Sequence, residues 1–552
     1  MRQTAWILIL CMLLGIFAGC TGEEAYVPTG HGLVEQQGQI PTETTEPPNP
    51  DDPTAVTRPE DRDFTLAYYE NEGFNPYTCA SFQNRMMFSL IYQGLFSVDR
   101  NYRPVPVLCS AYTASADLKD HTFEIEPSAT FSDGTPVTVA DVVASLNAAR
   151  DNSYYSGRFD NISAIYSIDD TSFRIETDTA YENLPLILDV PIVKAGQMED
   201  PMPLGSGPYS LVPTTSGLAL KLSGNWWCSA PLPVDEITIP LRPATSPARI
   251  RDSFEFDDVG ISISDPGASS YAEYRCDYEL WESETGIFLY LAANLASPVF
   301  SNDHVRAALT YAIDRYALLE KCYHGFGAVT TLPASPASPV FDRGLSTRVS
   351  YDPQHFADAV NQAGVAGEKI VLLVNKADSV RLQTARMIAQ MLENCGLTVE
   401  LLEESDYRYG EKLKTDEWDL YLGQTRLSAN MDLTAFFAPR GNLSYGDMDD
   451  PDAYEMAKKA LENSGNFYNL HEMILEDGQL VPILFRNYAI YARRGLAEDL
   501  QPARDNVFFY DTGKNLEDVM TVELAELEDE PEDEPEDEPE DDSGESDESD
   551  SD

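Results

Sequence analysis

The sequence has little of the residue types on which metal and redox chemistry depend. Its 552 residues include only six histidines, namely His31, His121, His304, His324, His355 and His471. His471 begins the segment "HEMIL", which lacks the second histidine of the zinc-binding HExxH motif. None of the eight cysteines belongs to a CxxC pair, so zinc or thioredoxin-type chemistry has no support. We therefore expect no catalytic residue, no bound metal and no cofactor.

Positive charge is also scarce. The chain has 37 Lys and Arg residues against 93 Asp and Glu residues, a formal net charge of −56. Seventeen of the acidic residues lie within 528–552, and the remainder of the chain still carries −39. This balance argues against nucleic-acid binding and against adsorption onto anionic lipid. Because like charges repel, residues 527–552 are predicted to form a disordered acidic tail.

Long hydrophobic runs are missing after residue 17. Before it, an apolar segment of signal-peptide length runs from Ala5 to Phe17 and follows Arg2. Its end, "FAGC", resembles the bacterial lipoprotein lipobox, which implies cleavage of residues 1–19 and lipid attachment at Cys20. Two acyl chains would anchor the protein stably. The alternative is an ordinary secretory signal followed by an incidental cysteine.

The anchor is followed by a segment without hydrophobic periodicity. Residues 21–62 are rich in Pro, Thr, Glu and Gly, so the range 20–62 is predicted to be a lipidated cysteine followed by a disordered tether. Six cysteines remain in the folded part: Cys79, Cys109, Cys228, Cys276, Cys322 and Cys395. An exported chain permits disulfides, and buried thiols are the alternative.

Residues 63–526 alternate between strand-like and helical patterns, which predicts an α/β fold. Strand-like runs include "FTLAYY", "HTFEIE", "SFRIET", "EITIPL", "IFLYLAANL", "KIVLLVN" and "LTVELLE". Thr138 and Asp141 form a capping-box pattern at the start of one helix. One helix is predicted from the apolar stripe of 303–324, and others over 352–363 and 379–395. The last lies between two strands, so residues 370–402 predict a βαβ unit with parallel strands.

Six segments occur in an order that is typical of a known family. They are "LIYQGLF", "FSDGTPVTVADVVASL", "LGSGPY", "HVRAALTYAIDRYALL", "YDPQHFADAVNQAG" and "PILF…YAIYARRGL". Together they resemble the extracellular solute-binding proteins of family 5, the receptors of oligopeptide, dipeptide and nickel ABC importers. The resemblance implies a two-lobed, periplasmic-binding-protein-like fold of type II, in the large three-subdomain form, with a hinged cleft that traps ligand.

The resemblance also implies a division of the chain. Lobe I would comprise residues 63–285 together with 486–526, and lobe II would comprise 286–485. The expected partners are a peptide-like or other small polar solute, the permease subunits of an ABC transporter, and the membrane through the lipid anchor. We expect a monomer on the outer face of the cytoplasmic membrane. The alternatives are a sensor or adhesin with the same fold and a surface hydrolase.

Three segments supply candidate ligand-binding residues, because pockets combine aromatic walls with a few fixed polar groups. The segment "YYENEGFNPY", which faces the cleft in the family, offers Asn71, Glu72, Phe74 and Tyr77. Asn375 ends a strand, a usual ligand position in α/β sheets, although a turn residue is the alternative. The segment "WDLYLGQTRLSANMD" offers Tyr421, Gln424, Arg426, Asn430 and Asp432.

Arg426 marks a departure from the family. Peptide-binding relatives carry an Asp in this segment that grips the ammonium group of the peptide, and here that place falls near Ala429 or Asn430. We expect Arg426 to hold an anionic or carbonyl-rich group of the ligand instead, since a guanidinium binds a carboxylate bidentately. The alternative is a salt bridge within the protein, for example to Asp432 or Glu72.

Overall fold

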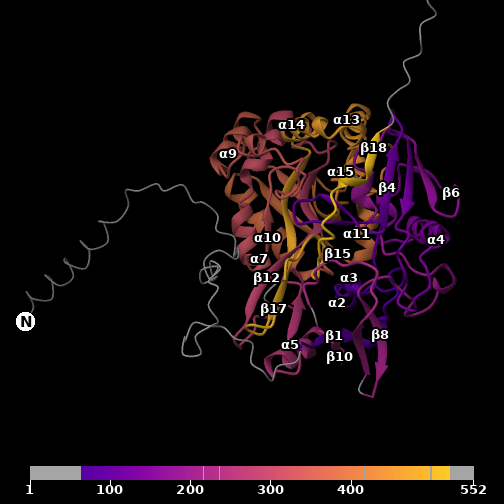
Figure 1. The fold of residues 1–552 in the computed structure, drawn as a ribbon. Coiled ribbons are helices and arrows are strands. Elements are labelled where there is room, and N and C mark those ends of the chain that lie inside the picture. The colour runs from indigo at the N-terminus through magenta and orange to yellow at the C-terminus, as the bar shows by residue number, and fades with distance from the viewer. Residues whose placement is uncertain (1–63, 216, 235, 416, 498–499, 523–552) are drawn as a thin grey trace, which may run out of the picture.

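The computed structural model describes residues 64–522, apart from 216, 235, 416 and 498–499 (Figure 1). The predicted signal peptide, Cys20, the tether and the acidic tail therefore lie outside the described residues. Three sheets, one of them only two-stranded, and many helices make up the fold, which confirms the predicted α/β class. All seven strand-like runs named from the sequence contain strands.

The larger sheet has eleven strands. Its spatial order is β15 (Thr398–Glu404), β14 (Lys369–Asn375), β16 (Leu420–Arg426), β12 (Glu279–Ala293), β17 (Leu480–Ala492), β11 (Ile261–Ser264), β1 (Leu66–Tyr69), β10 (Thr238–Ala244), β9 (Gly217–Leu222) and β8 (Tyr209–Thr214), while β13 (Gly327–Val329) pairs with β17. Strands β14 and β15 are parallel, as the predicted βαβ unit requires.

A second sheet combines the last strand of the described chain with four strands from its first third. Its order is β18 (Met520–Val522), β4 (Cys109–Ala114), β5 (Asp120–Ile125), β7 (Ser172–Thr177) and β6 (Ile162–Ser167), and β2 (Phe96–Val98) pairs separately with β3 (Pro104–Pro106). In Figure 1 the yellow β18 lies beside the indigo β4, with which it pairs in parallel. The C-terminal segment thus returns to the N-terminal part of the fold.

The helices that flank the sheets begin and end as follows. The α-helices are α2 (Phe82–Arg85), α3 (Phe88–Ile91), α4 (Val139–Arg150), α5 (Pro247–Glu255), α6 (Asp303–Ala308), α7 (Arg315–Tyr323), α8 (Arg343–Ser346), α9 (Pro353–Gln362), α10 (Ser379–Asn394), α11 (Asp406–Lys412), α12 (Thr434–Phe437), α13 (Pro451–Glu462), α14 (Phe467–Asp477) and α15 (Leu516–Val519). The short 3₁₀ helices are η1 (Glu70–Glu72), η2 (Ser156–Arg158), η3 (Leu184–Ile187), η4 (Ala195–Gln197), η5 (Leu309–Ala312) and η6 (Ser464–Asn466).

Local sequence signals placed some helices correctly and failed at one. Thr138 and Asp141 form the predicted capping box of α4, and Asp352 caps α9 with Pro353 in its first turn. The single helix predicted over 303–324 is wrong, because the structure divides it into α6, η5 and α7. Ile313 is extended, and the Asp314 side chain caps a new helix by accepting a hydrogen bond from the Ala317 N–H. A capping residue inside an apolar stripe restarted the helix.

Two long strands connect the ranges predicted as lobes I and II. β12 and β17 pair with each other along most of their length (Figure 1). β17 also pairs with β11 of the first range and β13 of the second, and β12 pairs with β16 of the second. Their ladder shifts register between Glu284 and Phe288, where the Thr285 hydroxyl donates to the Arg486 carbonyl oxygen. The regular pairing is therefore interrupted where the chain passes from one range to the other. The lobe boundaries themselves stay a prediction.

Candidate functional site

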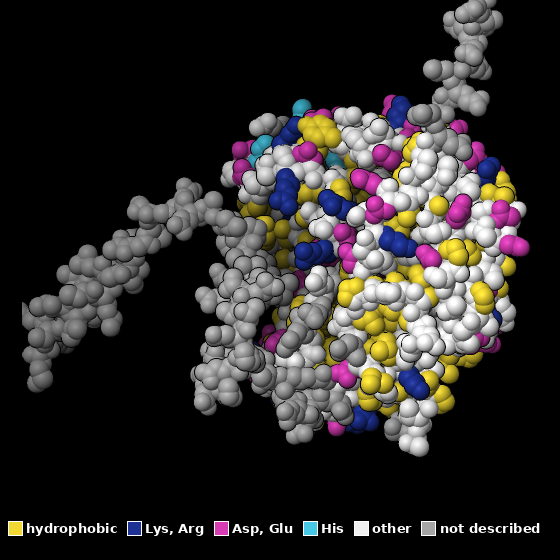
Figure 2. Space-filling model, viewed as in Figure 1, with side chains coloured by type: hydrophobic (Ala, Val, Ile, Leu, Met, Phe, Trp, Pro, Cys, Tyr) yellow, Lys and Arg dark blue, Asp and Glu magenta, His cyan; other side chains and the backbone are white. Residues whose placement is uncertain are grey.

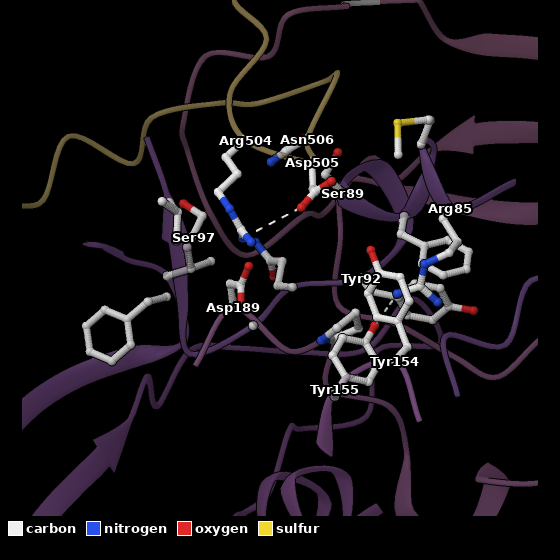
Figure 3. A pocket seen from close by; sticks show the side chains of 18 of the residues that line it. Arg85, Ser89, Tyr92, Ser97, Tyr154, Tyr155, Asp189, Arg504, Asp505 and Asn506 are labelled. Carbon is white, nitrogen blue, oxygen red and sulfur yellow. Dashed lines mark hydrogen bonds and ion pairs between the residues drawn. The ribbon is translucent and has the colours of Figure 1, made fainter. Parts of the chain in front are cut away.

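A pocket lies where three separate chain segments meet. Its lining comes from residues 85–107, 154–191 and 504–510, and its volume is about 130 Å³. In Figure 3, Arg504, Asp505 and Asn506 lie on one side of it, and Arg85, Tyr154 and Tyr155 lie on the other. All three segments belong to the predicted lobe I, and the pocket adjoins residues of the predicted lobe II through Asp505.

One wall of the pocket is built from arginines against tyrosine rings. The Arg85 guanidinium carbon lies 3.6 Å from the ring centroid of Tyr154, and its Nη2 donates to the Tyr155 hydroxyl at 2.6 Å. Arg158 lies 5.4 Å from the Tyr155 ring and forms an ion pair with Asp189. Stacking on an aromatic face fixes the plane of a guanidinium and thereby directs its N–H groups.

Arg426 connects this wall with the opposite one. Its Nη1 lies 2.5 Å from Oδ1 of Asp505, and its guanidinium carbon lies 5.2 Å from the Tyr154 ring. Asp505 adopts a left-handed backbone with φ of 53°, and its N–H donates to the Glu284 carbonyl oxygen at 2.7 Å. Burial alone would raise the pKa of Asp505, but Arg426 and Arg504 hold it below its usual value. The protein itself thus supplies a carboxylate for Arg426, and it is Asp505 rather than Asp432 or Glu72.

A second guanidinium links the same two ranges further along the sheet. Arg486 of β17 donates from Nη2 to both carboxylate oxygens of Asp265, at 2.6 and 2.8 Å. Its Nη1 donates to Oε1 of Gln424 at 2.9 Å. Gln424 is a predicted ligand residue, and here it serves as an acceptor for a buried arginine.

A third contact between the two ranges lies beside Asp432. Asn430 donates from Nδ2 to the Tyr181 hydroxyl at 2.7 Å, and the two residues are 249 positions apart. Oδ1 of Asp432 accepts hydrogen bonds from the N–H and hydroxyl of Thr434. Burial raises the pKa of Asp432, its hydrogen bonds from Thr434 oppose that rise, and the nearby Asp160 adds to it. No arginine or lysine of the described residues forms an ion pair with Asp432.

The other predicted ligand residues do not gather at the pocket. Tyr421 is buried against Trp418 and Tyr290. Asn375 stabilises a turn, where its side chain donates to Asp406 and accepts from the Ala377 N–H. Phe74 packs in the core beside Tyr68.

The loop before the pocket divides into two parts. Asn71 and Glu72 are exposed in η1. Tyr77 lies directly behind the pocket wall, because its hydroxyl donates to the carbonyl oxygen of Pro191, which lines the pocket.

Sequence reasoning missed the residues that form the pocket itself. Tyr154, Tyr155 and Arg158 lie in "NSYYSGR", and Arg504 and Asp505 lie in "ARDN". An aromatic pair followed by an arginine is a usable signal of a binding wall. Residues 504–505 carry no comparable signal. They line the pocket only because the C-terminal segment returns to the range predicted as lobe I.

Other chemistry leaves few traces in the described part of the chain. No group of three or more His, Cys, Asp or Glu residues there is placed to hold a metal ion. No helix there combines the length and apolarity needed to cross a bilayer. The six cysteines that the sequence left open all have free thiols.

Comparison with known proteins places the chain. The family model described as "Bacterial extracellular solute-binding proteins, family 5 Middle" matches residues 103–446. The chain belongs to this family. The glutathione-binding protein GsiB of Escherichia coli K12 is 26% identical over 294 residues, which cover 50% of this chain and 56% of GsiB. The chain thus spans about half the length of the curated relatives it matches.

Solved structures of the family share the fold. NikA from Brucella suis, in complex with Fe(III)-EDTA, has a TM-score of 0.63 at 17% identity and covers 78% of this chain and 95% of its own. AgaA from A. tumefaciens R10, in complex with agropinic acid, has a TM-score of 0.57 at 21% identity, with coverages of 78% and 93%. The predicted type II periplasmic-binding-protein fold is confirmed.

Proposed function

We propose that this protein captures a peptide-like or other small polar solute between its lobes and delivers it to the permease of an ABC importer. The observation that carries the proposal is the pocket in the predicted lobe I, which Arg426 of the predicted lobe II reaches through Asp505 and Tyr154. Arg486 and Gln424 make a second contact between the two ranges. Family membership supports the same role, since GsiB is named for binding glutathione. Contacts of this kind can form and break as a hinged cleft closes and opens.

The proposed site keeps the predicted residues that border the pocket and adds those that line it. Arg426 lies on the lobe II side, and Tyr154, Arg85 and Asp505 lie on the lobe I side. Gln424 is bound to Arg486 and is kept as a candidate for contact with a larger solute. We propose that the solute contacts Arg426 when the lobes close on it. The exposed Asn71 and Glu72 remain candidates for a larger solute that extends out of the pocket.

The solute can be identified directly. Residues 63–526, expressed without the tether and the tail, should retain small molecules that mass spectrometry detects after denaturation. Added solute should raise the melting temperature by mass action and should be recovered chemically unchanged. Turnover of the solute would favour the hydrolase alternative. If the protein binds the solute but deletion of a permease gene next to its own gene leaves uptake of that solute unchanged, the sensor alternative would be favoured.

The proposed membrane anchor has its own test. We propose that the chain is held on the outer face of the membrane by lipid on Cys20, and Cys20→Ala should move it to the soluble fraction. Cys228→Ala is the matched control, because it removes a cysteine from the folded part. A Cys20→Ala protein that stays with membranes after a carbonate wash would contradict the anchor.

A further inference from the structure

The charges around the pocket do not balance. Three guanidiniums but only two carboxylates line it: Arg85, Arg158 and Arg504 against Asp189 and Asp505. Beyond the lining, Arg426 shares Asp505 with Arg504, and Glu284 lies near Arg504. This local excess of positive charge occurs in a chain whose net charge is −56. On the face shown in Figure 2, by contrast, basic and acidic side chains are interspersed over the upper half.

Arg85 is the arginine of this group that lacks a carboxylate partner. Arg158 pairs with Asp189, and both Arg426 and Arg504 contact Asp505. Arg85 donates instead to neutral oxygens, at 3.0 Å to Pro76, 3.2 Å to Cys79 and 2.6 Å to Tyr155. Among the described residues it forms no ion pair. A largely enclosed guanidinium beside a cavity is stabilised when an anion enters that cavity.

We propose that the pocket binds a carboxylate group of the solute, and that Arg85 is the counter-cation for it. This inference rests on the proposed function and names the chemical class of the solute. A volume of about 130 Å³ holds several water-sized groups, so it accepts a carboxylate and its neighbouring carbon atoms but not a whole peptide. The rest of the solute therefore lies outside the pocket, on the side where Arg426 contacts Asp505 and Tyr154. Figure 3 shows Tyr154 and Asp505 in the lining.

Asp505 and Asp189 restrict where the carboxylate can go. Both line the pocket and both are already paired, so a solute anion is repelled from that side and is directed toward Arg85. An uncharged solute of equal shape should bind more weakly, because it would leave the charge of Arg85 uncompensated. The arrangement thus selects for charge as well as for size.

The test compares two peptide libraries on the full chain, purified in detergent. One contains neutral tripeptides with a free C-terminal carboxylate, and the other contains the same sequences as C-terminal amides. Bound peptides are counted by native mass spectrometry, and dissociation constants of recovered pairs are measured by calorimetry. The acids should bind at least tenfold more tightly than their amides. Equal affinity within a pair would overturn the inference and leave the proposed function intact.

A variant then locates the effect. Arg85→Gln should lower the affinity for acids to that for amides while leaving the amides unchanged, and Arg85→Lys should restore part of the difference. Arg348→Gln is the control, since Arg348 is an exposed arginine paired with Glu472. If Arg85→Gln fails to fold, the acid and amide pairs on the unaltered protein still decide. If neither library binds and no other solute co-purifies, the proposed function fails and this inference falls with it. If the solutes that co-purify are neutral or cationic, only the inference fails.

Discussion

Two buried aspartates face the same interface and respond to it in opposite ways. Asp505 lies 2.5 Å from Arg426, and its pKa is held below its usual value against the effect of burial. Asp432 lies near Asp160 and has no arginine partner among the described residues, and burial raises its pKa. Burial is similar at both positions, so the neighbouring charges decide the direction of the shift.

The difference separates two roles for a carboxylate at an interface. The charged form of Asp505 is favoured because it joins the C-terminal segment to β16 of the other range. The charged form of Asp432 is disfavoured, and what its side chain contributes is a turn that accepts two hydrogen bonds from Thr434. A change that removes charge should therefore be costly at the first position and nearly neutral at the second.

The largest effect is expected from breaking the pair at Asp505. Asp505→Ala should lower the free energy of unfolding by about 3 kcal/mol, because it leaves Arg426 without its carboxylate in a partly buried setting. Urea denaturation measures the loss. In a double-mutant cycle, adding Arg426→Gln should recover part of it. Strictly additive effects of the two changes would show that the contact contributes no coupling energy.

A smaller effect is expected on solute binding from Arg426. Arg426→Ala should weaken the identified solute by about 2 kcal/mol, roughly 30-fold in Kd, and should also lower the melting temperature of the empty protein. Arg426→Lys should restore only part of the affinity, since it loses the planar fork. Calorimetry at fixed salt measures both variants. Unchanged affinity in Arg426→Ala would show that this residue only bridges the two ranges.

The sequence predicted what depends on neighbouring residues. Signals within a few positions predicted the capping box of α4 and the start of α9. The alternation of strand, helix and strand over one continuous segment predicted the parallel pair β14 and β15. The break in the helix predicted over 303–324 shows the limit of such signals, because a cap at Asp314 overrode a continuous apolar stripe. Local chemistry sets elements well and sets their interruptions less well.

The pocket could not be assembled from sequence because its partners are distant along the chain. Arg426 and Asp505 are 79 positions apart, and no sequence signal links them. The salt-bridge partners considered from the sequence, Asp432 and Glu72, are not the ones it uses. Residue type makes Tyr421, Phe74 and Asn375 candidates for ligand binding. In the structure Tyr421 and Phe74 are buried in the core, and Asn375 stabilises a turn. Residue type and position along a strand indicate candidates, whereas the return of the C-terminal segment decides which of them face the pocket.

The smallest effect on stability is expected at Asp432, where the sign of the pH dependence is the informative result. Its folded-state pKa is raised, so the folded protein holds this proton more tightly than the unfolded chain does. The stability that comes from protonated Asp432 is therefore present below the unfolded pKa of about 4 and is lost as pH rises through the folded pKa. Asp432→Asn keeps an acceptor for Thr434 and removes this loss, so near pH 7 it should change stability by less than about 1 kcal/mol, with a gain favoured. Asp505→Asn should show the reverse pattern, because the stability that Asp505 contributes is present above pH 4 and is lost as pH falls through its lowered pKa. Urea denaturation at several pH values between 2 and 7 measures all variants, with Asp170→Asn as an exposed control. A clear loss of stability at pH 7 in Asp432→Asn would mean that its carboxylate is charged and paired, and the contrast between the two aspartates would not hold.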